Sequence, residues 1–232
     1  MKTIGILGGL GPEATIDYYK EIIDEFNQGS TNLNYPEILI YSVNMAKFIG
    51  MLEQADYHGA SRYLAGCINK LAEAGADFAA MSANTPHLLF SEIQDQTTIP
   101  LISIVETCKN RAKELGLKRC GLFGTKFTMK SSFFSESFAH EHIEIFTPEP
   151  RMIERIHLLL FSELELGIFK EETRAELLSI VCKMINDFEI DSLILGCTEF
   201  PIMFPEEYYL NIPFLNTTRI HVREIVKQSF DN

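Results

Sequence analysis

One cysteine stands where its ionisation could be used in chemistry. Cys197 ends the apolar run SLILG (192–196) and precedes Thr198 and Glu199 at the expected start of a helix. The positive end of a helix dipole favours the thiolate, so this position predicts a pKa below the usual value of about 8.5. The carboxyl group of Glu199 would either modulate proton transfer or cap the turn. The pattern therefore predicts a reactive thiol at Cys197.

A second stretch repeats this pattern without the thiol. The segment FAAMSANTPHLLF (78–90) parallels SLILGCTEFPIMF (192–204), and Ala83 occupies the place of Cys197. An alanine side chain neither accepts nor donates a proton, so Ala83 cannot do the acid–base chemistry that a thiol at this position could do. His87, on the following turn, and a bound water are candidates for its place.

Small and hydroxyl-bearing residues recur where strands are expected to end, in GGLGPEAT, SANTPH, GTKFTMKS and GCTEFP. In parallel α/β folds, ligands bind beyond the carboxyl ends of the strands, where helix N-termini present free N–H groups. Backbone amides and threonine hydroxyls can hold carboxylates there, although the same residues also serve as helix caps. Lys47 follows the second expected strand and could pair with a distal carboxylate. The candidate substrate-binding residues are Gly8, Gly9, Asn84, Thr85, Thr125, Thr128, Thr198 and Lys47.

The elements that must position these residues alternate along the chain. Apolar, β-rich runs predict strands at 3–8, 37–43, 77–83, 100–105, 119–124, 143–148 and 191–196. Amphipathic spacing predicts helices that include 60–76, 151–166 and 171–187. Alternation of strands and helices is typical of an α/β fold, in which helices cover a parallel sheet.

An internal repeat divides the chain into halves. GILGG (5–9) matches GLFGT (121–125) at nearly the offset that relates Ala83 to Cys197, about half the chain length. The two matching pairs predict two pseudo-symmetric Rossmann-like domains, each a mainly parallel sheet flanked by helices, with the active site in the cleft between them. The expected N-terminal domain comprises 1–101 plus 209–232, and the expected second domain comprises 102–208.

Charge and cysteine content exclude several classes of function. The net charge of −12 argues against nucleic acid or an anionic membrane as a partner, because both require clustered Lys and Arg. The five cysteines are widely separated and form no CxxC pair, which indicates reduced thiols in a cytoplasmic protein, without disulfides or a metal site. The N-terminal apolar run is too short for a signal peptide or a membrane span.

Four motifs in order carry a family resemblance. IGILGGLGPEAT (4–15), ANTPH (83–87), GTKFTM (124–129) and LGCTEFP (195–201) together resemble the aspartate/glutamate racemase family, from residue 3 to about residue 218. The resemblance implies two pseudo-symmetric α/β domains, often in a homodimer, and a small amino-acid substrate bound without pyridoxal phosphate or another cofactor. It also implies two cysteines on opposite faces of the substrate α-carbon, one removing a proton while the other supplies one.

The chain departs from this family pattern at one of the two cysteines. Cys197 matches the second, whereas Ala83 stands at the first, and Leu166 is read where the family often carries a lysine. The leading hypothesis is a racemase of aspartate, glutamate or a similar amino acid, with Cys197 as the base and a weak or absent acid opposite. Two alternatives stay open: a single-cysteine decarboxylase of the same superfold, and a non-catalytic amino-acid-binding form, either natural or engineered by a Cys-to-Ala change.

Overall fold

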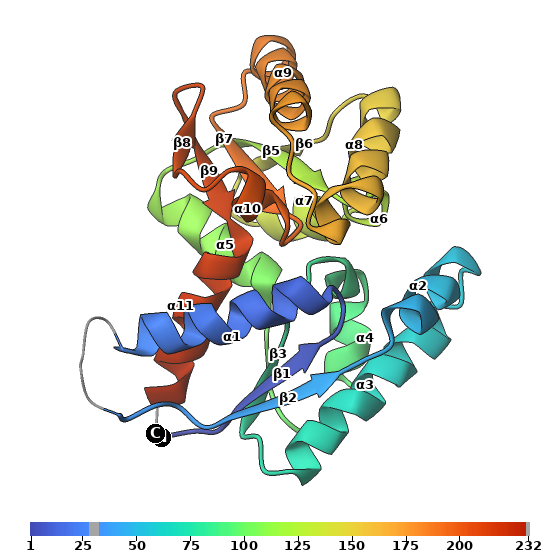
Figure 1. Ribbon diagram of the computed structural model, residues 1–232, viewed down its shortest axis with the longest axis vertical. Helices are drawn as coiled ribbons and strands as arrows, with labels where there is room; N and C mark the ends of the chain where they lie inside the picture. The colour runs from blue at the N-terminus through green and yellow to red at the C-terminus, as the bar shows by residue number, and fades with distance from the viewer. Residues whose placement is uncertain (28–32, 231–232) are drawn as a thin grey trace. The chain divides into compact units, whose positions relative to one another are not determined.

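A computed structural model describes residues 1–27 and 33–230, and its chain forms two compact units. Unit 1 comprises Met1–Ile104 and His221–Asn232, and unit 2 comprises Val105–Ile220. Figure 1 shows the course of the chain through the elements of each unit. Among the described residues, none of the helices combines the length and the apolar character that crossing a membrane requires.

Unit 1 is built on a four-stranded parallel sheet in the order β2-β1-β3-β4. Its strands are β1 (Ile4–Gly8), β2 (Ile38–Ser42), β3 (Phe78–Met81) and β4 (Leu101–Ile102). Its helices are α1 (Pro12–Asn27), α2 (Met45–Glu53), α3 (Tyr57–Glu73), the 3-10 turn η1 (Thr85–Leu89), α4 (Phe90–Gln94) and most of α11 (Thr217–Phe230). All five residues of β1 are buried, as expected for a central strand covered on both faces.

Alternation along the strands of unit 1 assigns helices to one face of its sheet. Ile4 and Ile6 of β1 join Phe78 of β3 in one buried cluster, together with Tyr18 of α1 and Val222 of α11. Successive side chains of a strand point to opposite faces, so α1 and α11 cover this face of the sheet. Helix α3 contacts β1, β2 and β3 as well.

Unit 2 has a five-stranded sheet in the order β6-β5-β7-β9-β8, in which only the β8 and β9 pair is antiparallel among the described strands. Its strands are β5 (Arg119–Gly124), β6 (Glu144–Phe146), β7 (Ser192–Gly196), β8 (Tyr208–Tyr209) and β9 (Ile212–Asn216). Its helices are α5 (Ile104–Glu114), α6 (Lys126–Lys130), α7 (Phe133–Ala139), α8 (Pro150–Ser162), the 3-10 turn η2 (Leu164–Leu166), α9 (Glu171–Phe188) and α10 (Phe200–Met203).

The two sheets repeat one topology. In each, the first strand in sequence is central, the second lies at its outer side, the third pairs on its other side, and a further strand follows the third. The predicted α/β class, with two mainly parallel sheets flanked by helices, is confirmed. Because β1 and β3 are parallel, Gly8 at the end of β1 and Ala83 just after β3 lie at the same edge of the unit 1 sheet. Thr125 and Cys197 follow β5 and β7 at the equivalent edge of sheet 2.

The observed units differ from the expected division at the C-terminal crossover. Residues 209–220 fall in unit 2, because β9 pairs in parallel with β7 and completes that sheet before α11 begins. The run IPFLN (212–216) was not among the expected strands, since a proline interrupts its apolar pattern. The expected helix at 151–166 is also shorter, ending at Ser162 and followed by the separate turn η2.

Candidate active site

The reactive-thiol candidate lies in the short connection between β7 and α10. Cys197 follows the fully buried strand β7 and is itself 7% exposed. Its Sγ donates a hydrogen bond to Oε2 of Glu199 at 2.9 Å. The hydroxyl of Thr198 lies 3.1 Å from both carboxyl oxygens of Glu199. Three consecutive residues therefore form one buried hydrogen-bonded group, with the glutamate at its centre.

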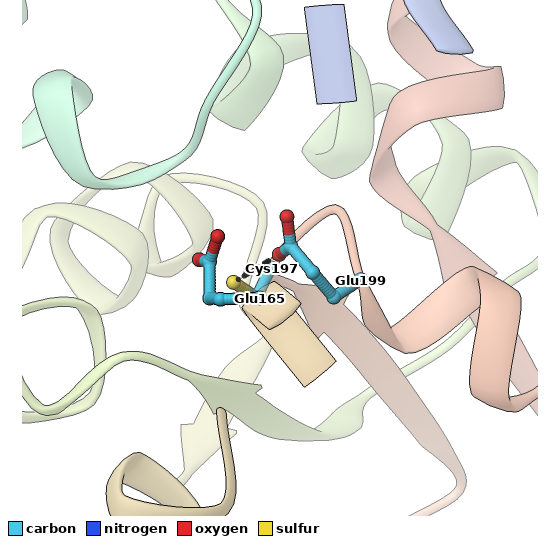
Figure 2. Close-up of side chains that lie close together, drawn as sticks. All are labelled: Glu165, Cys197 and Glu199. Carbon is cyan, nitrogen blue, oxygen red and sulfur yellow. Dashed lines mark hydrogen bonds between the residues drawn. The ribbon is translucent and has the colours of Figure 1, made fainter. Parts of the chain in front are cut away.

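A fourth residue from a distant part of the chain joins this group. Glu165, in the turn η2, places a carboxyl oxygen within 4.8 Å of both the Cys197 sulfur and a Glu199 oxygen. Figure 2 shows the two glutamate side chains flanking the sulfur. Glu165 is not among the residues expected from the sequence, in which the family's lysine position falls at Leu166, a residue that is 67% exposed. No periodicity marks an acid in the turn LEL as functional, so its proximity to Cys197 and Glu199 in the folded chain is the signal that identifies it.

The electrostatics of Cys197 contradict the expected lowering of its pKa. Burial raises the pKa of the Cys197 thiol well above its ordinary value, and the neighbouring charges of Glu199 and Glu165 raise it further. Helix α10 has only four residues, so few peptide dipoles align to favour a thiolate. Two nearby carboxyl groups outweigh that small dipole, and the thiol holds its proton in the unliganded protein.

The carboxyl group of Glu165 is also shifted. Burial raises the pKa of Glu165 to about 8, with a second contribution from the charge of Glu199. A carboxyl group with this pKa is mostly protonated at neutral pH. Burial disfavours the charged form of each group, and like charges at this separation oppose ionisation further, so both pKa values are raised.

By distance alone, Glu165, Cys197 and Glu199 could surround a metal ion, and they are the one such group among the described residues. Metal ligands must be deprotonated before they bind. The thiol proton of Cys197 is instead directed at Glu199, and Glu165 is largely neutral at pH 7. The protonation of this group therefore fits proton transfer better than metal binding.

The threonines of unit 2 have structural partners. Thr125 is the N-cap of α6, its side-chain oxygen accepting from the backbone N–H of Thr128 at 3.3 Å. Thr128 is fully buried, and a Cβ added at Gly124 would lie 2.9 Å from its Cβ. Both residues thus shape the loop after β5, where β5 pairs with β7.

The glycine motif of unit 1 forms a tight turn between β1 and α1. Gly9 has a φ of +77°, a conformation that glycine adopts without steric cost. Its N–H donates to Thr15 Oγ1 at 2.9 Å, and the Thr15 hydroxyl donates to the carbonyl oxygen of Gly11 at 3.1 Å. A Cβ on Gly8 would lie 2.4 Å from Cγ2 of Thr15. The small residues allow α1 to begin directly above the strand end.

The position equivalent to Cys197 is enclosed. Ala83 follows β3 and is 8% exposed, and Asn84 and Thr85 lie at the start of η1. His87 is buried: its Nδ1–H donates to the carbonyl oxygen of Ala83 at 3.0 Å, and its Nε2 accepts from the N–H of Ile104 at 3.1 Å. Burial lowers the pKa of His87 to about 3, so His87 is a neutral structural residue rather than a substitute acid.

The ammonium of Lys47 has an aromatic partner within unit 1. Lys47 belongs to α2, whose N-cap is Asn44, and its ammonium lies 4.2 Å from the centre of the Tyr63 ring. The structure therefore brings Cys197, Thr198 and Glu199 together in unit 2, and the Gly8–Gly9 turn and Ala83 to one sheet edge in unit 1.

Comparison with known proteins gives this arrangement a family. The sequence model of the family described as Asp/Glu/Hydantoin racemase matches residues 7–225. The chain belongs to this family.

Two solved structures match over the whole of both chains. One is titled a putative Asp/Glu racemase from Yersinia pestis, with 27% identity and a TM-score of 0.88. The other is titled an aspartate racemase homologue from Pyrococcus horikoshii, with 29% identity and a TM-score of 0.84.

A curated relative, the broad specificity amino-acid racemase RacX of Bacillus subtilis, is 29% identical over 138 residues. That match covers 57% of this chain and 59% of the relative. A glutamate racemase of Aquifex aeolicus is 26% identical over 146 residues, covering 61% of this chain and 54% of the relative. The chain thus spans somewhat more than half the length of these curated relatives.

Proposed function

We propose that this protein is a cofactor-independent racemase of aspartate, glutamate or a similar amino acid, with the Cys197 thiolate as the base that removes the α-proton. The observation that carries the proposal is the 2.9 Å hydrogen bond from Cys197 to Glu199, in a chain of the racemase family. The carboxylate gives the thiol proton an acceptor at the strand end where the family resemblance places the chemistry.

The proposed step moves two protons. The S–H bond of Cys197 breaks and the proton passes to Oε2 of Glu199. The thiolate then takes the α-proton, its C–H electron pair staying on the substrate carbon as a carbanion conjugated with the carboxylate. A neutral group or a water returns a proton to that carbon. Because Cys197 holds its own proton in the unliganded protein, the positive α-ammonium of an amino-acid substrate would favour the thiolate at the moment of binding.

The alanine at position 83 makes the proposed site asymmetric. A site with one thiol has a strong base for one face of the α-carbon and a weak donor for the other. We therefore expect one enantiomer to exchange its α-proton faster than its mirror image. Equal exchange rates for the two enantiomers would contradict this part of the proposal.

The test is exchange in deuterated water. The protein is incubated with each enantiomer of aspartate and of glutamate, the α-proton is followed by NMR, and the enantiomer ratio by chiral chromatography. Cys197→Ser should lower exchange by about a hundredfold or more, because a positioned acid–base group contributes about 10²- to 10⁴-fold. Cys182→Ser is the matched control, since Cys182 is an exposed thiol of the same unit.

The remaining outcomes separate the alternatives. Binding of an amino acid without any exchange would indicate a non-catalytic binding protein. Release of carbon dioxide from a malonate, with no exchange of amino acids, would indicate a single-cysteine decarboxylase. Exchange that survives Cys197→Ser would show that another group is the base.

A further inference from the structure

Glu165 is held in place by a well-defined turn. The preceding residue, Leu164, is 2% exposed and belongs to the hydrophobic core of unit 2. Gly167 ends the turn with a φ of +71°, and its N–H donates to the carbonyl oxygen of Leu164 at 2.9 Å. The N–H of Ile168 donates to the carbonyl oxygen of Glu163 at 3.0 Å. The buried leucine and these backbone bonds fix the direction in which the Glu165 side chain leaves the turn.

Two glutamates of this segment have opposite environments. Glu163 pairs with the ammonium of Lys170 at 2.8 Å and accepts from the hydroxyl of Thr173 at 2.5 Å, and these bonds lower the pKa of its carboxyl group. The neighbouring charge that acts on Glu165 is instead the negative charge of Glu199. A protein that needed only a stable turn here would gain nothing from placing an acid beside another acid and a thiol.

The other titratable groups on the elements around this turn are engaged elsewhere. On α8, Arg155 forms an ion pair with Glu176 of α9 at 2.7 Å. Nδ1 of His157 lies 3.4 Å from the backbone nitrogen of Lys126, which donates to it. With Glu163 bound to Lys170, the Cys and Glu side chains that converge with the Glu165 carboxyl group among the described residues are Cys197 and Glu199.

We propose that Glu165 controls the ionisation of Cys197, permitting a thiolate while it is neutral and opposing the thiolate once it is ionised. This inference rests on the proposed function, in which Cys197 is the base. When Cys197 passes its proton to Glu199 beside a neutral Glu165, the three groups carry one negative charge both before and after the transfer. When Glu165 is ionised, the new thiolate faces a second anion within 4.8 Å. Glu165 thus influences the reaction only through the ionisation of Cys197 and does not itself exchange a proton with the substrate.

The consequence is an unusual response to pH. A thiol without such a neighbour becomes a better base as pH rises, because more of it is thiolate. Here burial and the charge of Glu199 raise the pKa of Glu165 to about 8, so ionisation of Glu165 begins to oppose the thiolate at moderately alkaline pH. We expect α-proton exchange to fall above about pH 8 and the fall to disappear in Glu165→Gln.

The direct test titrates Cys197 itself. Ultraviolet absorbance of thiolate is followed from about pH 6 to about pH 12, far enough to include a raised thiol pKa, in the wild-type protein, Glu165→Gln and Glu172→Gln. Each protein is paired with its own Cys197→Ser counterpart. The difference within a pair isolates Cys197 from the other cysteines. Glu172 is an exposed carboxylate of α9, so Glu172→Gln makes the same chemical change away from the thiol.

The expected result is that the titration midpoint of Cys197 is lower in Glu165→Gln than in the wild type, by about one pH unit or more. Wild type and Glu172→Gln should have the same midpoint. Circular dichroism over the same pH range checks the fold. If the glutamine variant unfolds, Glu165→Leu supplies a second neutral side chain that suits the apolar turn. An unchanged midpoint in a folded neutral variant would overturn the proposal.

The same samples distinguish this proposal from the proposed function. Exchange of aspartate and glutamate is measured in parallel. A shifted thiol midpoint without exchange in any protein would retain the coupling of Glu165 to Cys197 and reject the racemase. Exchange with an unchanged midpoint would retain the racemase and reject the role of Glu165.

Discussion

The Sγ of Cys197 lies 2.9 Å from Oε2 of Glu199, two residues further along the chain, and the thiol donates to the carboxyl oxygen. This contact sets the character of the site. It supplies a proton acceptor, and the same negative charge opposes the thiolate that the acceptor would create. The thiol therefore stays protonated until something offsets the charge, which limits reaction of Cys197 in the absence of a ligand.

Replacement of the acceptor should separate thiol acidity from catalysis. In Glu199→Gln, the pKa of Cys197 should fall, because the charge of Glu199 and the hydrogen bond to it both raise that pKa. Exchange of the α-proton should nevertheless fall by about tenfold or more, since the thiol proton loses its acceptor. Thiolate absorbance and exchange in deuterated water measure the two effects. Faster exchange together with the lower pKa would show that Glu199 only restrains the thiol.

The sequence was sufficient to locate Cys197 and Glu199 but not to describe their electrostatics. An apolar run followed by polar residues predicts the end of a strand and the residues next to it. The internal repeat relates this strand end to the one before Ala83. The pKa direction depended on burial, on the four-residue length of α10 and on Glu165, which lies far from Cys197 in sequence. A sequence pattern carries no information on which distant turn packs against a strand end.

The sheets were predictable to a similar degree. Strands β1, β3, β5 and β7 are continuous apolar runs, because both faces of a parallel sheet are covered. Strand β9 contains Pro213 and partly exposed residues, so its pattern is weak, and its pairing with β7 moves 209–220 into unit 2. The unit to which a strand belongs depends on the strand it pairs with, and that pairing forms only in the tertiary structure.

The glycine turn of unit 1 predicts a stability difference between two alanine substitutions. Gly9→Ala should destabilise the protein by about 2 kcal/mol or more, because Gly9 has a φ of +77° and a new Cβ would lie 2.5 Å from the carbonyl oxygen of Val43. Gly66→Ala is the control: Gly66 is exposed within α3 and a Cβ there meets no atom within 4 Å. This change should stabilise by about 0.5–1 kcal/mol. Urea unfolding measures both, and equal effects would contradict the described turn.

Two buried histidines predict a loss of stability in acid. Burial lowers the pKa of His87 to about 3 and that of His221 to about 4, while an unfolded chain titrates near 6.5. The neutral ring of His221 donates Nε2–H to the carbonyl oxygen of Ile102 at 3.0 Å and accepts at Nδ1 from the hydroxyl of Tyr18 at 2.9 Å. Between the folded-state pKa of each histidine and the unfolded value near 6.5, the unfolded chain binds more protons than the folded protein does. The free energy of unfolding therefore falls as pH decreases.

The size of the histidine effect follows from the two shifts. From pH 7 to pH 5, the two residues should together lower the free energy of unfolding by about 3 to 4 kcal/mol. His221→Gln should remove about half of this dependence, since glutamine can bond to neighbours without titrating. His140→Gln, on an exposed residue, should leave it unchanged. Urea unfolding at the two pH values provides the measurement. An equal change in the free energy of unfolding for wild type and His221→Gln would contradict the assignment of half of the pH dependence to His221.

The vacant position offers the most direct test of the racemase proposal. Ala83 is the counterpart of Cys197 in the repeat, each following the strand that pairs with the first strand of its unit. Ala83→Cys would supply the second thiol that the family resemblance implies. We expect the slower enantiomer to gain about tenfold or more in exchange, with the two enantiomers approaching equal rates.

Ala83→Ser controls for the size of the new side chain, because a hydroxyl occupies similar space but is a far weaker acid than a thiol. Ala83 is 8% exposed, so both variants must first be shown to fold, by circular dichroism and urea unfolding. A gain confined to the cysteine variant would assign the asymmetry to the missing acid. No gain in a folded Ala83→Cys protein, beside measurable exchange by the wild type, would mean that the second proton reaches the α-carbon from elsewhere, and that the chain is a one-thiol catalyst in its own right.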